Sequence, residues 1–115
     1  MPISRLADCL VETNRDIEAT GLVAPIVGHV GDGNFHVSVM GMVEDVEEMA
    51  RIKAFVGRLN GRAIAMDGTC TGEHGIGQGK REDLLREHGD NVLTMRAIKA
   101  ALDPRGLMNP GKIFA

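Results

Sequence analysis

Two histidines flank an Asp-Gly pair in a short β-rich stretch of the sequence, at positions 29 and 36. Asp-Gly is a preferred two-residue type I′ hairpin loop, because both central residues of that turn need φ above zero. With Asp32 and Gly33 as the loop, the register predicts that His29 lies directly opposite His36. Cross-strand neighbours have Cβ atoms about 4.5–5.5 Å apart. Two imidazoles at that separation could bind one divalent cation, although they could also simply flank a surface turn.

Strand alternation divides the hairpin side chains between two faces. One face carries the two histidines together with Val27, Asn34 and Ser38, and the other carries Ile26, Val30, Phe35, Val37 and Val39. We therefore expect the second face to pack in the core. Asn34 and Ser38 become candidate substrate contacts on the polar face.

A glycine-rich segment, residues 67–80, contains two further chemical groups, Glu73 and His74. Its glycine spacing matches neither the dinucleotide fingerprint nor the phosphate loop. Together, His29, His36 and Glu73 would make a nitrogen and carboxylate site with open positions, as in catalytic zinc sites. Because adjacent side chains of an extended loop diverge, we expect His74 to stand beside the metal without binding it, free to accept a proton.

The chemistry of such a site is not decided by its residues alone. A cation would polarise a bound hydroxyl or carboxylate while a histidine takes the proton, which is half of an oxidation. The sequence shows no motif for a hydride acceptor. Three interpretations stay open: an incomplete oxidoreductase, a stand-alone zinc metallohydrolase with a bound water as nucleophile, and a non-catalytic metal-binding module.

The elements around these residues follow from hydrophobic periodicity and from capping and turn residues. The first expected element is a helix capped by Ser4 that ends near Gly21, followed by strands at about 24–30 and 34–40. A helix over 46–66 comes next, with Val46 in its apolar stripe. The last two elements are a helix over 81–87 that ends at His88-Gly89 and a helix capped by Asp90 that ends at Leu102. Asp16 is expected on the solvated face of the first helix. This order predicts an α+β fold. Since an isolated two-stranded sheet is marginal in water, we expect self-association as a homo-oligomer.

Composition narrows the classes of protein. The chain has 115 residues, 43% hydrophobic and 25% charged, with a net charge of −3, which fits a single globular domain. Trp and Tyr are absent and Phe occurs three times, so a nucleic-acid interface is not expected. Cys9 and Cys70 lie outside any CxxC pattern, and we interpret them as reduced thiols of a cytoplasmic protein. No apolar run reaches the roughly 20 residues that span a bilayer, and peripheral membrane attachment through a partner stays open.

Three motifs in order point to a family. They are His29-Val-Gly-Asp-Gly-Asn-Phe-His36, Gly72-Glu73-His74-Gly75-Ile76-Gly77, and a tail from Leu102-Asp103-Pro104 through Asn109-Pro110-Gly111-Lys112-Ile113-Phe114. Together they resemble the C-terminal, substrate-facing domain of FAD-linked oxidases of the vanillyl-alcohol oxidase type. That family includes D-lactate dehydrogenase (cytochrome), the glycolate oxidase FAD-linked subunit and D-2-hydroxyglutarate dehydrogenase. The resemblance runs from about Pro2 to Phe114 and implies an α+β, partial ferredoxin-like cap domain over the flavin of FAD.

The resemblance also implies roles for individual residues. His29, His36 and Glu73 would hold a divalent metal, usually zinc, that binds the 2-hydroxy acid substrate. His74 would contact the substrate and take its hydroxyl proton as a hydride passes to FAD. Asn109 would lie close to the flavin.

Two departures from the family pattern qualify these implications. Relatives that act on the longer dicarboxylate have Asn where this chain has Ser38, which favours lactate or glycolate. Family members are also several times longer, and their FAD-binding domain lies upstream of the matching region. The resemblance therefore implies that residues 1–115 are a C-terminal fragment of the cap domain. Such a fragment would need an FAD-binding domain or subunit as its partner and would be inactive alone.

Overall fold

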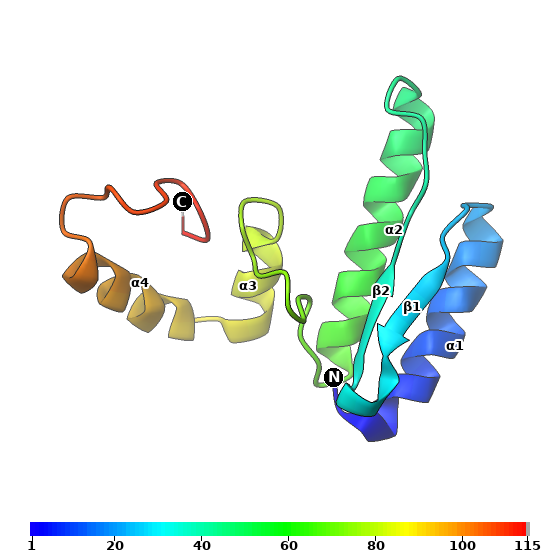
Figure 1. Ribbon diagram of the computed structural model, residues 1–115, viewed down its shortest axis with the longest axis horizontal. Coiled ribbons are helices and arrows are strands. Elements are labelled where there is room, and N and C mark those ends of the chain that lie inside the picture. Colours follow the sequence, from blue (N-terminus) through cyan, green and yellow to red (C-terminus); the bar gives the residue numbers. More distant parts are fainter. Residues whose placement is uncertain (115) are drawn as a thin grey trace. The chain divides into compact units, whose positions relative to one another are not determined.

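The computed structural model describes residues 1–114 and divides into two compact units, Met1–Gly72 and Glu73–Ala115. The first unit holds two long helices and a β-hairpin, and the second holds two shorter helices with their loops (Figure 1). The elements are α1 (Ile3–Thr20), β1 (Ile26–His29), a 3₁₀ turn η1 (Val30–Asp32), β2 (Asn34–Val37), α2 (Val46–Ala65), α3 (Arg81–His88) and α4 (Asn91–Leu102). The predicted α+β class and element order are confirmed. Within residues 1–114, no helix combines the length and the apolar character needed to cross a membrane.

Helix α1 is capped two residues earlier than expected. Pro2 is the N-cap residue, with no side-chain cap hydrogen bond, and Ser4 lies inside the first turn. The predicted Ser4 cap is therefore wrong, because the chain enters the helix from the extended backbone of Pro2 at φ −55° and ψ 131°. The predicted end is confirmed: Gly21 adopts φ 65°, and its N–H donates to the carbonyls of Ile17 and Glu18, as at many helix C-termini.

The hairpin differs from the prediction in its loop and therefore in its register. His29 pairs with Asn34, and Val27 pairs with His36. Residues 30–32 form a 3₁₀ turn, and Gly33 follows with φ 67°, so the loop has four residues instead of two. Asp32 does not take the positive φ that a type I′ turn requires. The predicted direct opposition of His29 and His36 is wrong by two residues, and a shift of two leaves the side chains of the paired strands on their predicted faces. The prediction that Val30 packs in the core is wrong, because Val30 lies in the 3₁₀ turn and is 57% exposed.

The core of the first unit lies between the inner face of the hairpin and the helices α1 and α2. Its buried centre consists of Leu22, Ala24 and Phe55, and partly buried side chains pack around it: Ile17, Val37, Val39, Ile52, Val56 and Leu59. Phe55 is completely buried, whereas Val46 is 80% exposed. The apolar stripe predicted for α2 therefore reaches too far toward the N-terminus, where Asp45 caps the helix by accepting the N–H of Glu48 at 2.9 Å.

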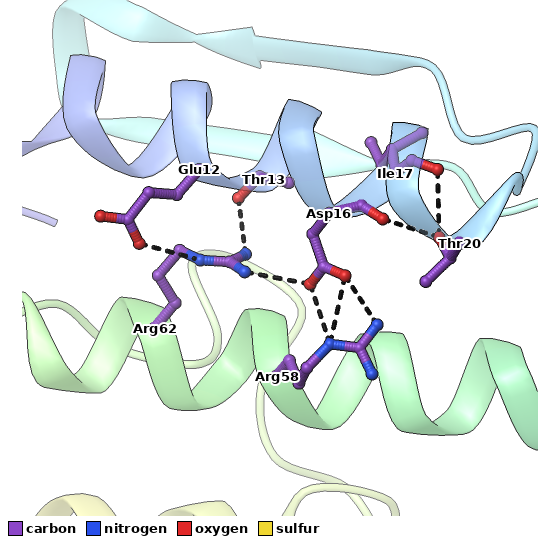
Figure 2. A network of polar contacts seen from close by, with 7 residues as sticks. All are labelled: Glu12, Thr13, Asp16, Ile17, Thr20, Arg58 and Arg62. Atoms are coloured by element: carbon purple, nitrogen blue, oxygen red, sulfur yellow. Dashed lines mark hydrogen bonds and ion pairs between the residues drawn. The ribbon is translucent and has the colours of Figure 1, made fainter.

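A polar network joins α1 to α2 (Figure 2). The Asp16 carboxylate accepts hydrogen bonds from Arg58, with Nη2 to Oδ1 at 2.7 Å, and from Arg62 Nη2 at 3.0 Å. Arg62 also donates to the hydroxyl of buried Thr13 at 3.0 Å and pairs with Glu12 at 3.3 Å. The hydrogen bonds from Arg58 lower the pKa of Asp16, and Asp16 raises the pKa of Arg58. The expectation that Asp16 simply faces solvent is wrong.

The second unit is organised around the end of α4. The Asp103 carboxylate accepts the backbone N–H groups of Leu107 and Met108, each at 2.9 Å, and forms an ion pair with Lys99. Lys99 lowers the pKa of Asp103. This carboxylate therefore folds the tail back onto the last turn of the helix. At the other end of α4, Asp90 occupies the predicted N-cap position, although its side chain makes no cap hydrogen bond, and Gly89 ends α3 as expected.

Candidate metal centre

The two histidines lie together on the outer face of the hairpin. Their rings meet edge to face, with centroids 6.3 Å apart and planes 87° apart. His29 is exposed and His36 is partly buried. They are diagonal neighbours across the strands, since the partner of His29 is Asn34, and diagonal side chains as long as imidazole remain within reach of one another.

The separation of the rings tests whether the pair fits a metal ion. Bonds of about 2.0–2.1 Å from a tetrahedral ion to two imidazole nitrogens place the ring centroids about 5 Å apart. The observed 6.3 Å exceeds that value by about 1 Å, given the same bond lengths. A small rotation of either side chain closes this difference, so the pair fits a divalent metal that accepts nitrogen ligands.

The rest of the outer face changes from polar to apolar along the strands. Asn34 lies opposite His29, and Ser38 is exposed just beyond β2, where its N–H donates to the carbonyl of Pro25 at 3.0 Å. Val27 lies opposite His36, and the isolated bridge between Val23 and Met40 continues the face. All three apolar side chains are exposed. Asn34 and Ser38 therefore share the face of the histidine pair, as predicted from alternation.

The third candidate ligand is attached to the hairpin through its neighbour in the chain. Gly72, the last residue of the first unit, lies so close to Asn34 that a Cβ placed on it would stand 2.6 Å from Asn34 Oδ1. Glu73 follows Gly72 directly and begins the second unit. Glu73 offers a carboxylate oxygen, and the two histidines offer ring nitrogens, which is a donor set typical of zinc.

Glu73 and His74 do not diverge as the sequence suggests. His74 Nε2 lies 3.7 Å from Glu73 Oε1, and both side chains are exposed. The expectation of divergence assumed an extended loop, whereas Gly75 and Gly77 both take positive φ in this segment. The two side chains therefore lie within reach of each other, and the carboxylate can orient the imidazole.

Asn109, the predicted flavin contact, lies in the tail of the second unit. It has φ 47°, which is unusual for a residue other than glycine, and its carbonyl accepts the N–H of Lys112 at 3.2 Å. A cavity of about 220 Å³ opens beside it and is lined in part by Leu102, Met108, Asn109, Lys112, Ile113 and Phe114. The sequence did not single out Lys99 and Asp103 as the pair that shapes this region, although their i, i+4 spacing was a usable signal.

The predicted site residues are thus divided between the two units. His29, Asn34, His36 and Ser38 share one face of the first unit, and Glu73, His74 and Asn109 belong to the second.

Comparison with known proteins identifies the family of the chain. Residues 1–113 match the model of the family described as "FAD linked oxidases, C-terminal domain".

Named relatives match nearly the whole chain. The chain is 53% identical, over 99% of its length, to the "Probable D-lactate dehydrogenase, mitochondrial" of Danio rerio. It is 46% identical over 99% of its length to the "D-lactate dehydrogenase [cytochrome], mitochondrial" of Kluyveromyces lactis, and 37% identical over its full length to the "Glycolate oxidase subunit GlcD" of Bacillus subtilis. The chain covers only 23%, 19% and 25% of these three proteins. Residues 1–115 therefore belong to the family of C-terminal domains of FAD-linked oxidases.

Proposed function

We propose that this chain is the substrate- and metal-binding C-terminal domain of an FAD-dependent D-2-hydroxyacid dehydrogenase of the D-lactate or glycolate class. The observation that carries the proposal is the pair of imidazoles on the outer face of the hairpin, in a chain of this family. The printed names of its relatives, D-lactate dehydrogenase and glycolate oxidase, supply the substrate class.

Each candidate residue has a chemical role in this proposal. His29 and His36 bind a divalent metal through one ring nitrogen each, and Glu73 binds it through a carboxylate oxygen. The metal we propose is zinc. The ion, when bound, acts as a Lewis acid for the substrate's hydroxyl and carboxylate oxygens. His74 accepts the hydroxyl proton, and the C–H hydrogen leaves with its electron pair to FAD, so a 2-hydroxy acid becomes a 2-oxo acid.

The charge of the outer face of the hairpin indicates how many carboxylates the substrate has. The described residues that share this face with the two histidines are Val23, Val27, Asn34, Ser38 and Met40, and none of these five carries a positive charge. A second substrate carboxylate would find no cationic partner on this face. Asn34 and Ser38 offer hydrogen bonds to a single carboxylate, which favours the small monocarboxylic acids lactate and glycolate.

The proposal needs partners that this chain does not provide. An FAD-binding domain or subunit must hold the cofactor, with Asn109 beside the flavin, and the chain is inactive without it. We further propose that the isolated chain forms a homo-oligomer, since among the described residues the sheet has two strands only, and each strand has one edge that pairs with no other strand. The cytoplasmic location and the peripheral membrane association through a partner stay predictions. Two of the three relatives named above carry the word mitochondrial in their names.

Reconstitution tests this function. The chain is mixed with a separately expressed FAD-binding domain and zinc, and the reduction of a dye is followed with D-lactate and with glycolate. We expect turnover in the mixture and none with either component alone. An assembled, zinc-loaded complex without turnover would contradict the proposal, and so would ester or amide hydrolysis by the chain alone with zinc, because that activity belongs to a metallohydrolase.

A further inference from the structure

In the second unit, the glycine-rich loop and the C-terminal tail are joined by three hydrogen bonds. The N–H of Ile113 donates to the carbonyl of Gly77 at 2.7 Å. Arg81, the first residue of α3, donates through Nε to the carbonyl of Gln78 at 3.2 Å and through Nη1 to the carbonyl of Gly111 at 3.4 Å. The Arg81 side chain thus bridges two segments that are far apart in the sequence.

The chemistry of arginine suits this bridge. A guanidinium is planar, always charged, and directs its N–H donors in a fixed fork. Its Nε and Nη1 can therefore serve two carbonyls at once and keep them at a constant separation. A lysine ammonium is a single point at the end of a flexible stem, and it does not reproduce that geometry.

The tail needs such support because its backbone is strained. Asn109 has φ 47° and Ile113 has φ 61°, although neither is glycine. Asparagine tolerates this left-handed region better than most residues, whereas for a β-branched residue such as isoleucine it is a genuine outlier. Strained conformations of this kind persist only where the surrounding contacts hold them. For Ile113, this contact is the hydrogen bond that its N–H donates to the carbonyl of Gly77.

We propose that Arg81 is a positioning residue, which holds the tail that carries Asn109 in register with the loop that carries His74. The consequence for the reaction rests on the proposed function, because it assumes that His74 accepts the proton and that Asn109 faces the flavin. His74 lies three residues before Gly77, and Asn109 two residues before Gly111. The bridge therefore joins the segments of the base and of the flavin contact at points close to both residues.

The first test measures the tail directly in this chain. Amide hydrogen exchange at Ile113 is compared in the wild type, in Arg81→Ala and in Arg86→Ala, a control on the same helix whose guanidinium is 56% exposed and pairs at 3.7 Å with Asp83. We expect Ile113 to be protected in the wild type and to exchange about tenfold faster in Arg81→Ala, with no change in Arg86→Ala. An unprotected Ile113 in the wild type, or equal exchange in both variants, would overturn the proposal.

The second test measures the reaction in the complex with the FAD-binding domain. We expect Arg81→Ala to lower kcat by about 10- to 100-fold, the effect of a small misplacement of reacting groups, with the KM for D-lactate unchanged. Added guanidinium should restore part of the rate at constant ionic strength, ammonium should not, and Arg81→Lys should resemble Arg81→Ala. A kcat equal to that of Arg86→Ala would refute the positioning role. An inactive wild-type complex would instead refute the proposed function, and the exchange result would then decide the bridge alone.

Discussion

His29 lies opposite Asn34, and not opposite His36, and yet the two imidazole rings meet edge to face with centroids 6.3 Å apart. The diagonal arrangement leaves room for an ion between the rings after a small side-chain rotation. It also places Val27 directly opposite His36, so one histidine has an apolar neighbour and the other has the amide of Asn34.

The histidine pair predicts a specific loss of metal affinity. We expect His29→Ala and His36→Ala each to weaken zinc binding by about 100-fold or more, since each removes one protein ligand from a site with few of them. His88→Ala is the matched control, because His88 lies at the end of α3 beside Glu87, with the two side chains 3.4 Å apart. Isothermal titration of the chain with zinc measures the affinities. Equal affinity in all three variants would exclude the pair as the binding site.

The contact between Gly72 and Asn34 predicts a second effect on the site. In Gly72→Ala, the new Cβ would stand 2.6 Å from Asn34 Oδ1, so either the Asn34 side chain beside His29 or the loop that carries Glu73 must shift. We expect zinc affinity to fall by about tenfold, as when a group that orients a metal ligand is lost.

Gly57→Ala is the control for that variant, because nothing lies within 4 Å of a Cβ at Gly57, which is inside α2. This change should leave zinc binding intact and raise the free energy of unfolding by about 0.5–1 kcal/mol, the difference in helix propensity. Titration with zinc and thermal unfolding followed by circular dichroism separate the two effects. A Gly72→Ala variant with wild-type affinity would show that Glu73 does not depend on this contact.

The network between α1 and α2 predicts how stability depends on pH. The folded-state pKa of Asp16 is lowered, chiefly by the hydrogen bonds from Arg58. The stabilisation is therefore fully present above the unfolded carboxyl pKa of about 3.9, and it is lost as the pH falls through the lower folded value. Asp16→Asn should cost about 1–3 kcal/mol at pH 7, where charged hydrogen bonds are lost, and the variant should lose less stability than the wild type on acidification below about pH 4. Urea unfolding at several pH values tests this, and parallel pH profiles would contradict it.

The core predicts the largest loss of stability. Phe55 is completely buried at the centre of the first unit, so Phe55→Ala should destabilise it by about 3–5 kcal/mol. Val46→Ala is the control, because Val46 is 80% exposed at the start of the same helix. Its effect should stay within about 0.5 kcal/mol, as for most surface substitutions. Chemical unfolding of both variants makes the comparison, and a small effect at Phe55 would mean that the core is not packed as described.

The parts of the fold that depend on local signals were predictable from the sequence. Gly21 and Gly89 mark helix ends because they accept backbone conformations that other residues resist. The alternation of side chains placed the residues of β1 and β2 on the correct faces, but not Val30, which lies in the turn. The register was not predictable, since Asp-Gly favours a two-residue loop, and nothing local showed that residues 30–32 would form a 3₁₀ turn.

The partners of polar residues were harder to predict, because they lie far along the chain. Asp16 looked like a surface residue of α1, and its partners Arg58 and Arg62 lie 42 and 46 residues away. Arg81 likewise gave no sign of its contact with the carbonyl of Gly111, 30 residues away. Phe55 is different: it lies three residues after Ile52 and four before Leu59, so the same helical spacing that selected its neighbours could have found it.

The four-residue connection between β1 and β2 limits how the hairpin can vary in length. Deleting one residue while the connection keeps four residues would shift β2 by one residue against β1, and His36 would then point into the hydrophobic interior. Removing or inserting two residues under the same condition would keep the imidazole on the outer face and only slide it along the neighbouring strand. Engineered variants whose register shifts by an even number of residues should therefore keep the proposed zinc ligand on the outer face, and odd shifts should remove it.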